Sequence, residues 1–279
     1  MKTLVLQSFR SHDVPAWIER CLASAKAWSE LRGYDYLLTD DSAFDLCGTE
    51  YLARVGGNLR SITNLCRLEL SRRAHIQGYD RTVWLDADIL VFDPLAFSVD
   101  GVRRYAFARE TWVELRAPRR WRAFSAVNNS AFVCLRGEPD LDFLIDATRH
   151  VARHREIRTN YQVGGDLIKG LRASLDFELL HSVGMLSNYV VLALASNHAE
   201  LLQAQARFHG TPVFAANLCA SGNYSPPVSE RRVLAAIDVL ERSKGGAIND
   251  WIARSQATDR LDLGKEVEFA GPDLSDLMR

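Results

Sequence analysis

Short apolar runs alternate with segments of helical periodicity along the first part of the chain. Thr3 to Leu6 is a compact apolar run, as expected of a buried strand. A helix is predicted to begin near Pro15 and to end at Gly33, and a second strand is predicted over 34–38. The apolar positions that define the buried face of this helix are Trp17, Cys21 and Trp28. Strand, helix and strand in this order are typical of a parallel, Rossmann-like sheet.

The rest of the chain continues this alternation. The further predicted strands are the run that leads into Asp86 and Asp88, and residues 105–108, 131–135, 175–180, 189–194 and 213–216. The further predicted helices cover 62–77, with Ser61 as its cap, 141–154, 198–207, and 229–242, with Ser229 as its cap. Residues 110–125 show no clean period, so we expect a long loop or a short helix there, and a loosely packed tail after Gly264. The pattern predicts an α/β fold.

The composition is that of a globular protein. The chain has 279 residues, of which 47% are hydrophobic and 25% are charged. This length suffices for one large α/β domain, or for one domain with a small appendage. The formal net charge of −1 gives no reason to expect nucleic-acid binding.

Cysteine usage and hydropathy favour a reducing, cytoplasmic location. The five cysteines are scattered and form no CxxC pair, so neither a zinc site nor a disulfide framework is predicted. No secretory signal is visible in Met1 to Gln7. The best candidate for a membrane span, residues 183–195, is shorter than the ~20 residues that a spanning helix needs. Peripheral contact with a membrane stays open.

Two aspartates one residue apart, Asp86 and Asp88, follow the apolar run Val83 to Leu85. Buried carboxylates are costly unless they are paired or bound to a cation, and two together repel each other. Ligands bind at the carboxyl ends of strands in open α/β sheets. Both side chains could therefore reach one hard divalent cation there, Mn²⁺ or Mg²⁺. The alternative is a turn with two solvated aspartates.

The segment that contains this pair, Tyr79 to Val91, resembles the DxD segment of GT-A glycosyltransferases. It is most similar to the retaining type that includes glycogenin and the bacterial lipopolysaccharide galactosyltransferases. In that family the motif holds a divalent metal together with the ribose and diphosphate of a sugar nucleotide. The resemblance covers roughly residues 1–220 and implies a GT-A fold, with a Rossmann-like mixed sheet flanked by helices. We therefore expect a catalytic domain over 1–225, and a helical extension with a tail over 226–279.

Three further segments carry the resemblance in the family's order. Thr63 to Arg67 resembles the helix whose arginine contacts the nucleotide sugar, so Arg67 is implied to bind the donor. Asn64 departs from the small residue or aspartate that is usual nearby. Asn128 to Leu135 resembles the segment beside the donor sugar, which implies a donor contact for Asn129, with an alanine in place of the usual glycine. The alternatives are a surface salt bridge for the arginine and a plain strand start for the asparagine.

The third segment, Asn160 to Leu167, resembles the one whose aspartate binds the hydroxyls of the donor sugar near the anomeric carbon. The resemblance implies a catalytic role for Asp166, with Gln162 as its neighbour at the same site. Alternatively, Asp166 caps the helix that follows it.

The resemblance also implies a histidine late in the chain as a third metal ligand. His209, in the segment Arg207 to Gly210, is the candidate, although the lysine that completes the family's pattern is missing. His181 is the alternative, because it too follows an apolar run. Ser8 and Asp40 lie at the ends of the first two predicted strands, where the base and ribose of a nucleotide would bind.

Residues 110–125 combine arginines with aromatic side chains. Tryptophan faces stack on sugar rings, and arginines pair with phosphate or carboxylate groups. This segment is therefore a candidate binding site for an acceptor. The alternative is a solvated charged loop. Its members are Trp112, Arg116, Arg119, Arg120, Trp121, Arg122 and Phe124.

Together these features imply a metal-dependent hexosyltransferase. The enzyme would move a sugar from a nucleotide-diphosphate sugar, a UDP-sugar in the first instance, to a hydroxyl group. The acceptor would be a glycan, a lipid-linked molecule or a small molecule. No general base stands out, which agrees with retention of configuration in the resembled enzymes. Two alternatives stay open: a phosphatase of the haloacid dehalogenase type, which also places Asp-x-Asp after an apolar strand, and a non-catalytic GT-A-like module that binds nucleotide or carbohydrate.

Overall fold

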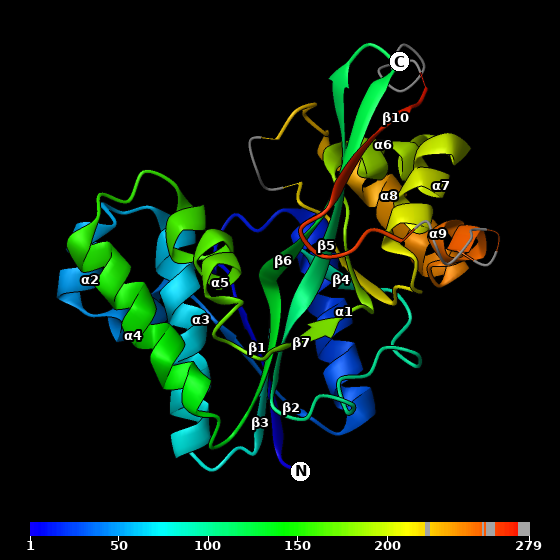
Figure 1. Ribbon diagram of the computed structural model, residues 1–279. Coiled ribbons are helices and arrows are strands. Elements are labelled where there is room, and N and C mark those ends of the chain that lie inside the picture. The colour runs from blue at the N-terminus through cyan, green and yellow to red at the C-terminus, as the bar shows by residue number, and fades with distance from the viewer. Residues whose placement is uncertain (221–223, 253, 255–259, 273–279) are drawn as a thin grey trace.

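A mixed β-sheet with helices on both faces forms the centre of the molecule (Figure 1). The computed structural model describes residues 1–220, 224–252, 254 and 260–272. The strands of the central sheet are β1 (Thr3–Ser8), β2 (Asp35–Thr39), β3 (Arg81–Leu85), β5 (Tyr105–Ala117), β6 (Arg120–Leu135), β7 (Glu178–Leu180) and β10 (Glu266–Ala270). Their order is β2-β1-β3-β6-β5-β7, and β10 pairs with β6. The predicted α/β class, with a mixed sheet flanked by helices, is confirmed.

Parallel and antiparallel pairing divide this sheet into two parts. β1 pairs in parallel with β2 and with β3, as the order strand, helix, strand predicts. β6 runs antiparallel to β3, β5 and β10, and β7 runs parallel to β5. A smaller sheet contains β4 (Ile89–Val91), β9 (Ala215–Asn217) and β8 (Val183–Met185), in that order. The turn 86–88 connects β3 of the large sheet to β4 of the small one.

The helices and 3₁₀ turns are α1 (Ala16–Arg32), η1 (Asp41–Cys47), α2 (Thr49–Arg54), α3 (Leu59–Ile76), α4 (Pro139–His154), η2 (Asn160–Val163), α5 (Gly165–Leu171), α6 (Asn188–Ser196), α7 (Ala199–His209), α8 (Glu230–Ser243) and α9 (Gly246–Ile252). On one side of the sheet α3 packs against η1 and α4, and on the other α1 packs against α8 (Figure 1). In the described residues, none of these helices combines the length and the hydropathy that crossing a bilayer would require.

The ends of the helices follow from single residues. Gly33 ends α1 in the left-handed conformation, with φ of 67°, which glycine adopts without a steric penalty. Asn58 begins α3, because its side chain accepts a hydrogen bond from the backbone N–H of Ser61. The prediction that Ser61 is the cap is therefore wrong by one turn. Ser229 is the N-cap residue of α8, but its side chain makes no capping hydrogen bond.

A long hairpin, β5–β6, occupies the region where we expected a loop or a short helix. The two strands pair along nearly their whole length. Val113 and Trp121 point into the core that contains α6 and α7, whereas Trp112 and Glu114 line a cavity. The prediction for 110–125 is wrong because charged and aromatic residues on the cavity face obscure the alternation of a strand.

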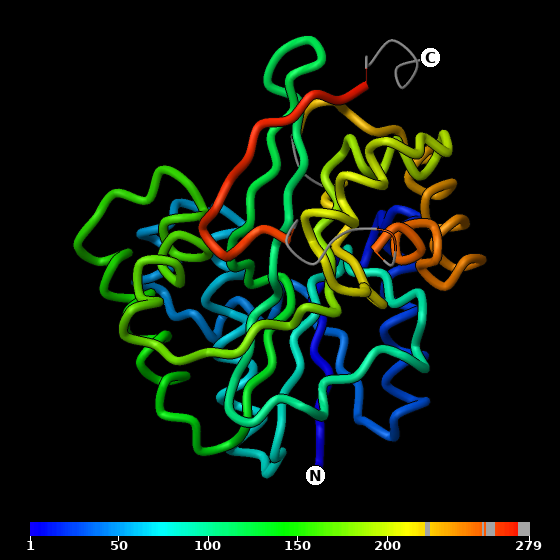
Figure 2. Tube along the Cα trace, turned by 45° about the vertical axis from the view of Figure 1, so that its right-hand side comes forward, coloured from blue at the N-terminus to red at the C-terminus, as the bar shows by residue number. Residues whose placement is uncertain are grey.

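Two predictions in the C-terminal half are also wrong. The apolar run 189–194 lies in helix α6 rather than in a strand. It is buried throughout, so its sequence carries no period that would separate helix from strand. The part of the tail after Gly264 that the structure describes, residues 265–272, is not loosely packed, because β10 pairs with β6 and runs along the hairpin (Figure 2). Residues 273–279 lie outside the described residues. Val267 and Phe269 of β10 pack against the neighbouring core.

An insertion in the hairpin interrupts its ladder. The register shifts between Phe107 and Ala108 of β5, so that residues 129–131 are extra on β6 and form a bulge. Within this bulge the carbonyl oxygen of Ser130 accepts a hydrogen bond of 2.7 Å from the backbone N–H of Asp86. The bulge thereby holds the turn that carries the two aspartates.

The helices after residue 225 share a hydrophobic core with the N-terminal part of the chain. Val233, Ile237 and Leu240 of α8 belong to the same buried cluster as Trp17 and Ile18 of α1. Burial of such side chains contributes about 1.5–3 kcal/mol each.

Candidate functional site

A cavity of about 860 Å³ lies at the carboxyl ends of β1 and β3, and residues of α3, α5 and the β5–β6 hairpin also line it. Six of the residues that the sequence analysis selected line this cavity: Ser8, Arg67, Asp86, Asp88, Asn129 and Asp166. The carboxyl end of parallel strands is where ligands bind in open α/β sheets. The fold therefore brings separate segments of the chain to one place suited to a ligand.

Asp86 is the first residue after β3, and two groups hold its carboxylate. Its Oδ1 accepts a hydrogen bond of 2.7 Å from Nε1 of Trp84 and lies 3.2 Å from an Nη atom of Arg67. Burial raises the pKa of Asp86, whereas the Arg67 charge and the Trp84 hydrogen bond oppose this rise. Both contacts favour the charged carboxylate that a cation requires.

Arg67 is a buried guanidinium, which excludes the alternative of a surface salt bridge. It is 5% exposed and lies over the ring of Trp84, with 5.3 Å between the guanidinium carbon and the ring centre. It also donates hydrogen bonds to the backbone carbonyls of Thr63 and Asn129. Arg67 therefore ties α3 to the aspartate turn and to the bulge of β6.

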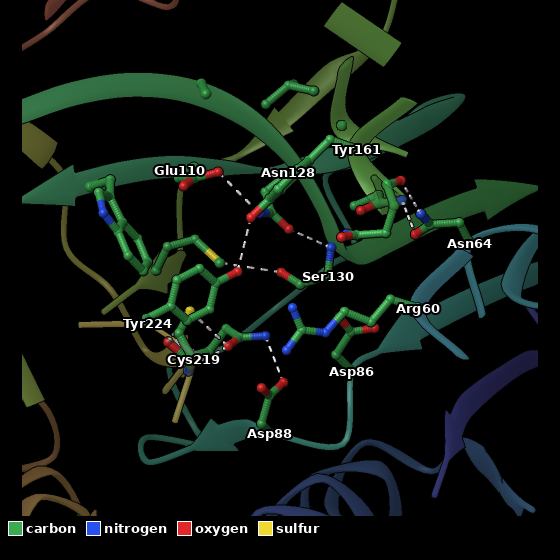
Figure 3. Close-up of a pocket in the computed structure, with 18 of the residues that line it drawn as sticks. Arg60, Asn64, Asp86, Asp88, Glu110, Asn128, Ser130, Tyr161, Cys219 and Tyr224 are labelled. Carbon is green, nitrogen blue, oxygen red and sulfur yellow. Dashed lines mark hydrogen bonds between the residues drawn. The ribbon is translucent and has the colours of Figure 1, made fainter. Parts of the chain in front are cut away.

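Asn217, which the sequence analysis missed, orients Asp88. Its Nδ2 donates a hydrogen bond of 2.7 Å to Oδ1 of Asp88 (Figure 3). The backbone carbonyl of Asp88 also accepts a hydrogen bond of 3.0 Å from the N–H of Leu218. Asn217 reaches this place because β9 pairs with β4 directly after the aspartate turn. No local pattern around residue 217 indicates that long-range pairing.

Cys219 lies beside this contact in a left-handed backbone conformation, with φ of 52°. Its N–H donates a hydrogen bond of 2.8 Å to Oδ1 of Asn217, and its Sγ lies 3.1 Å from the same oxygen. Burial raises the pKa of the Cys219 thiol well above its usual range, so the side chain is a neutral donor rather than a nucleophile. The carboxamide oxygen of Asn217 is thus occupied, and Asn217 acts as a positioning residue for Asp88.

Asn64 connects three of the segments that the sequence analysis singled out. Its Nδ2 donates a hydrogen bond of 2.9 Å to the carbonyl of Asn160, and its Oδ1 accepts one of 3.0 Å from Nδ2 of Asn129. A Cβ atom at Gly164 would lie only 2.4 Å from Nδ2 of Asn64, so a larger residue at this position would displace the Asn64 side chain from its hydrogen bonds. The residue that departs from the family's pattern is therefore the one that joins α3, the bulge and the loop before α5.

Three further ionisable side chains line the cavity. Asp166 and Lys169 are exposed on α5. Gly164 is the N-cap residue of α5, so the alternative that Asp166 caps this helix is wrong. Glu110, which the sequence analysis missed, accepts a hydrogen bond of 3.0 Å from Nδ2 of Asn128. Burial raises the pKa of Glu110, and the hydrogen bond from Asn128 and the positive charge of Lys169 oppose this rise.

The hairpin contributes an aromatic wall with paired charges. The rings of Trp112 and Tyr224 lie 5.3 Å apart between their centres. Glu114 lies 3.0 Å from Nε of Arg116 and 2.8 Å from an Nη atom of Arg122. Four members of the basic and aromatic segment that we considered for an acceptor therefore line the cavity, with part of their positive charge neutralised: Trp112, Arg116, Arg122 and Phe124. Trp121 is instead buried in the core, and Arg119 and Arg120 do not line the cavity.

His209 lies outside the cavity, and the structure contradicts its predicted role as a metal ligand. It is 1% exposed. Its Nε2 donates a hydrogen bond of 2.8 Å to the carbonyl of His181, and its Nδ1 accepts one of 3.0 Å from the hydroxyl of Thr111. Neither ring nitrogen has a lone pair left for a cation. His181, the alternative, lies 3.2 Å from an Nη atom of Arg260 and does not line the cavity either.

Gln162 and Asp40 are also placed away from this cavity. Oε1 of Gln162 accepts hydrogen bonds of 2.7 Å and 3.0 Å from the backbone N–H groups of Arg158 and Thr159, and so caps η2. The expected catalytic position of Gln162 is therefore wrong. Asp40 accepts hydrogen bonds from Ser42 and lines a neighbouring cavity of about 750 Å³. Phe9 lines both cavities, so the two adjoin.

The Asp86–Asp88 turn offers part of a metal site. Among the residues that the structure describes, no group of three His, Cys, Asp or Glu side chains could hold a metal ion. Two carboxylates are nonetheless a usual protein contribution for Mg²⁺, whose other positions are filled by water and substrate phosphates. Hard oxygen donors also suit Mn²⁺. The residues present therefore fit a hard divalent cation that a phosphorylated ligand completes.

Comparisons with known proteins find similar solved structures, two of which are glycosyltransferases with the following similarities. A glycosyltransferase involved in the glycosylation of the major capsid of PBCV-1 matches over 86% of this chain and 98% of its own, with 7% sequence identity and a TM-score of 0.48. The PaToxG glycosyltransferase matches over 92% of this chain and 88% of its own, with 11% identity and a TM-score of 0.36. No protein-family model and no curated protein sequence matches the chain.

Proposed function

We propose that this protein is a metal-dependent glycosyltransferase that moves a sugar from a nucleotide-diphosphate sugar to a hydroxyl group. The observation that carries the proposal is that residues from four separate segments line one cavity: Arg67, Asp86, Asp88, Asn129 and Asp166. The resemblance to retaining GT-A glycosyltransferases assigns these residues to the metal, the nucleotide and the donor sugar. Local structure alone does not require the four segments to meet.

The two aspartates would hold Mn²⁺ or Mg²⁺, which when bound would stabilise the negative charge of the leaving diphosphate as a Lewis acid. Arg67 holds Asp86 and Asn217 holds Asp88, through the contacts described above. Both carboxylates are therefore oriented before a ligand arrives, and such preorganisation lowers the cost of binding charge in the transition state.

The transfer itself exchanges one bond to the anomeric carbon for another. The bond from this carbon to the phosphate oxygen breaks, and its electron pair stays on that oxygen. The acceptor hydroxyl oxygen bonds to the same face of the carbon, and its proton passes to the departing phosphate oxygen, so that configuration is retained. Asp166, exposed at the cavity, would bind hydroxyls of the donor sugar and stabilise its positive charge.

The two adjoining cavities offer separate places for the nucleoside of the donor and for the acceptor. Ser8 and Phe9, at the end of β1, would contact the ribose and base of the donor, uracil in the first instance, and the second cavity extends from them. The hairpin wall with Trp112 and Tyr224 would bind the acceptor, since aromatic faces and paired charges suit a glycan, a lipid-linked sugar or a small hydroxylated molecule.

A screen of sugar nucleotides tests this proposal. Each donor is incubated with the protein in Mn²⁺ or in excess chelator, and release of the free nucleoside diphosphate is measured. We expect Mn²⁺-dependent release from one donor class, which rises when the acceptor is supplied. Two results would overturn the proposal. The first is hydrolysis of an aryl phosphate without any use of sugar nucleotides, and the second is tight nucleotide binding without turnover of any donor.

A further inference from the structure

Arg60 is an exposed cation at the cavity, and its charge has no carboxylate partner among the described residues. It lies in the first turn of α3. Its side chain extends into the cavity, on the side where Tyr224 lies (Figure 3). The ring of Tyr224 is 6.0 Å from the guanidinium carbon, which is the outer limit of a cation–π contact. Arg60 is thus held loosely and points into the site.

The other arginines of the cavity have partners. Arg67 is paired with Asp86 at 3.2 Å. Arg116 and Arg122 are both paired with Glu114, at 3.0 Å and 2.8 Å. Their charges are therefore largely used within the protein, whereas the charge of Arg60 is available to a ligand.

The place of Arg60 on its helix also argues for a ligand. Positive charges are unfavourable in the first turn of a helix, because the helix dipole is positive there. The charge of Arg60 therefore stabilises neither helix α3 nor any ion pair within the described residues. An anion in the cavity would gain from both the dipole and the guanidinium group.

The charge of Arg60 acts on two other groups that line the cavity, Cys219 and Tyr224. Burial raises the pKa of Cys219 and of Tyr224, and the charge of Arg60 opposes this rise in both groups. Cys219 contacts Asn217, which in turn holds Asp88. Arg60 and Asp88 line the same cavity.

We propose that Arg60 binds the terminal phosphate of the nucleotide-diphosphate donor, the phosphate that bears the sugar. This inference rests on the proposed function, because a nucleotide donor would bring a phosphate to the cavity. Tyr224 also contacts Trp112 of the acceptor wall, which places Arg60 at the transfer end of the diphosphate. A planar guanidinium group can donate two parallel hydrogen bonds to one phosphate. It would supply the positive charge that the buried His209 and the missing lysine do not.

Binding measurements with a matched pair of variants test the proposal. Wild-type protein is titrated calorimetrically with the diphosphates of uridine, guanosine and adenosine in Mn²⁺, and the tightest ligand is compared with its monophosphate. We expect Arg60→Gln to weaken binding of the diphosphate by about 10–100-fold and of the monophosphate by less than about threefold. Arg73→Gln, an exposed arginine at the other end of α3, should change neither. Arg60→Lys should restore part of the loss, since it keeps the charge without the planar fork.

Three outcomes would overturn the inference. Unchanged affinity of Arg60→Gln for the diphosphate would show that the guanidinium group does not touch it. Equal losses for diphosphate and monophosphate would show that Arg60 only supports Tyr224 and the shape of the cavity. If wild-type protein binds none of the diphosphates, the proposed function fails, and this inference fails with it. A urea unfolding midpoint for each variant shows that the protein remains folded.

Discussion

Asn129 donates a hydrogen bond of 3.0 Å to Asn64, and this contact joins the bulge of β6 to helix α3. The same bulge accepts a hydrogen bond from the backbone of Asp86, and the same helix carries Arg67, which pairs with Asp86. The position of the aspartate turn thus depends on two elements that are fastened to each other. Asn64 sets the geometry of the site without being an expected ligand.

Asn64→Ala should destabilise the protein and slow the reaction together. The substitution leaves the Nδ2 of Asn129 and the carbonyl of Asn160 without their partner. Both residues are half-buried at the cavity, so the cost should lie at the lower end of the about 1–3 kcal/mol that an unsatisfied buried polar group costs. Urea unfolding and donor turnover measure the two effects. Asn64→Asp keeps the acceptor for Asn129 but places a second acceptor against the carbonyl of Asn160, so it should destabilise the protein as well. An alanine variant with wild-type stability and turnover would contradict this role.

Asp88→Ala should abolish the metal-dependent step while the fold persists. One preorganised electrostatic contact is typically worth about 10²–10³-fold in rate, and removal of a metal ligand should cost at least that much. The measurement is nucleotide release from the sugar donor over a range of Mn²⁺ concentrations. Asp142→Ala, an exposed aspartate on α4, is the matched control. Full activity of Asp88→Ala would refute the assignment of the aspartate turn as the metal site.

Asp166→Ala should lower turnover far more than it lowers affinity for the nucleotide. Asp166 is exposed at the cavity and has no capping role on α5, so its loss should leave stability within about 0.5 kcal/mol of wild type. Steady-state kinetics with the sugar donor and titration with the free nucleoside diphosphate separate the two quantities. Asp176→Ala, whose side chain is 99% exposed, serves as control. Equal losses in turnover and affinity would indicate a binding or structural role only.

His209→Gln should reduce stability without changing the Mn²⁺ dependence of the reaction. Burial lowers the pKa of His209 from 6.5 to about 3. Below pH 6.5 the unfolded chain therefore binds a proton that the folded chain does not, and stability from this group falls as the pH falls, by up to about 1.4 kcal/mol per unit. Glutamine does not titrate, so the variant lacks this pH-dependent contribution to stability. The difference in unfolding free energy between wild type and variant should thus shrink from pH 7 to pH 5 in urea titrations. A raised Mn²⁺ requirement in the variant would instead restore His209 as a ligand.

The sequence alone predicted those site residues whose positions follow from the local pattern of strands and helices. Asp86 and Asp88 stand directly after a buried strand, and Arg67 stands on a helix that leads into it, so their meeting follows from the order of a strand–helix–strand unit. The same reasoning placed Asn129 and Asp166 at the cavity through a family's segment order. The class of the fold followed from the alternation of apolar runs and helices.

The contributions of Asn217 and Glu110 could not be predicted for a physical reason. Asn217 reaches Asp88 only because β9 pairs with β4, and Glu110 reaches the cavity only because β5 pairs with a bulged β6. Such pairings join distant parts of the chain and leave no periodic signal at either residue. The prediction for His209 was wrong for a different reason. The sequence pattern is the same whether a side chain at the end of α7 points toward a cavity or into the core.

The bulge at residues 129–131 makes the number of residues in this stretch as important as their identity. Loss of one residue there would slip β6 against its neighbours, and a slip by one position exchanges the two faces of a strand. Phe124 and Asn128, which now face the cavity, would then turn toward the apolar layer behind the hairpin. Divergent homologues should therefore tolerate exchanged side chains in this stretch far more readily than a shortened or lengthened one.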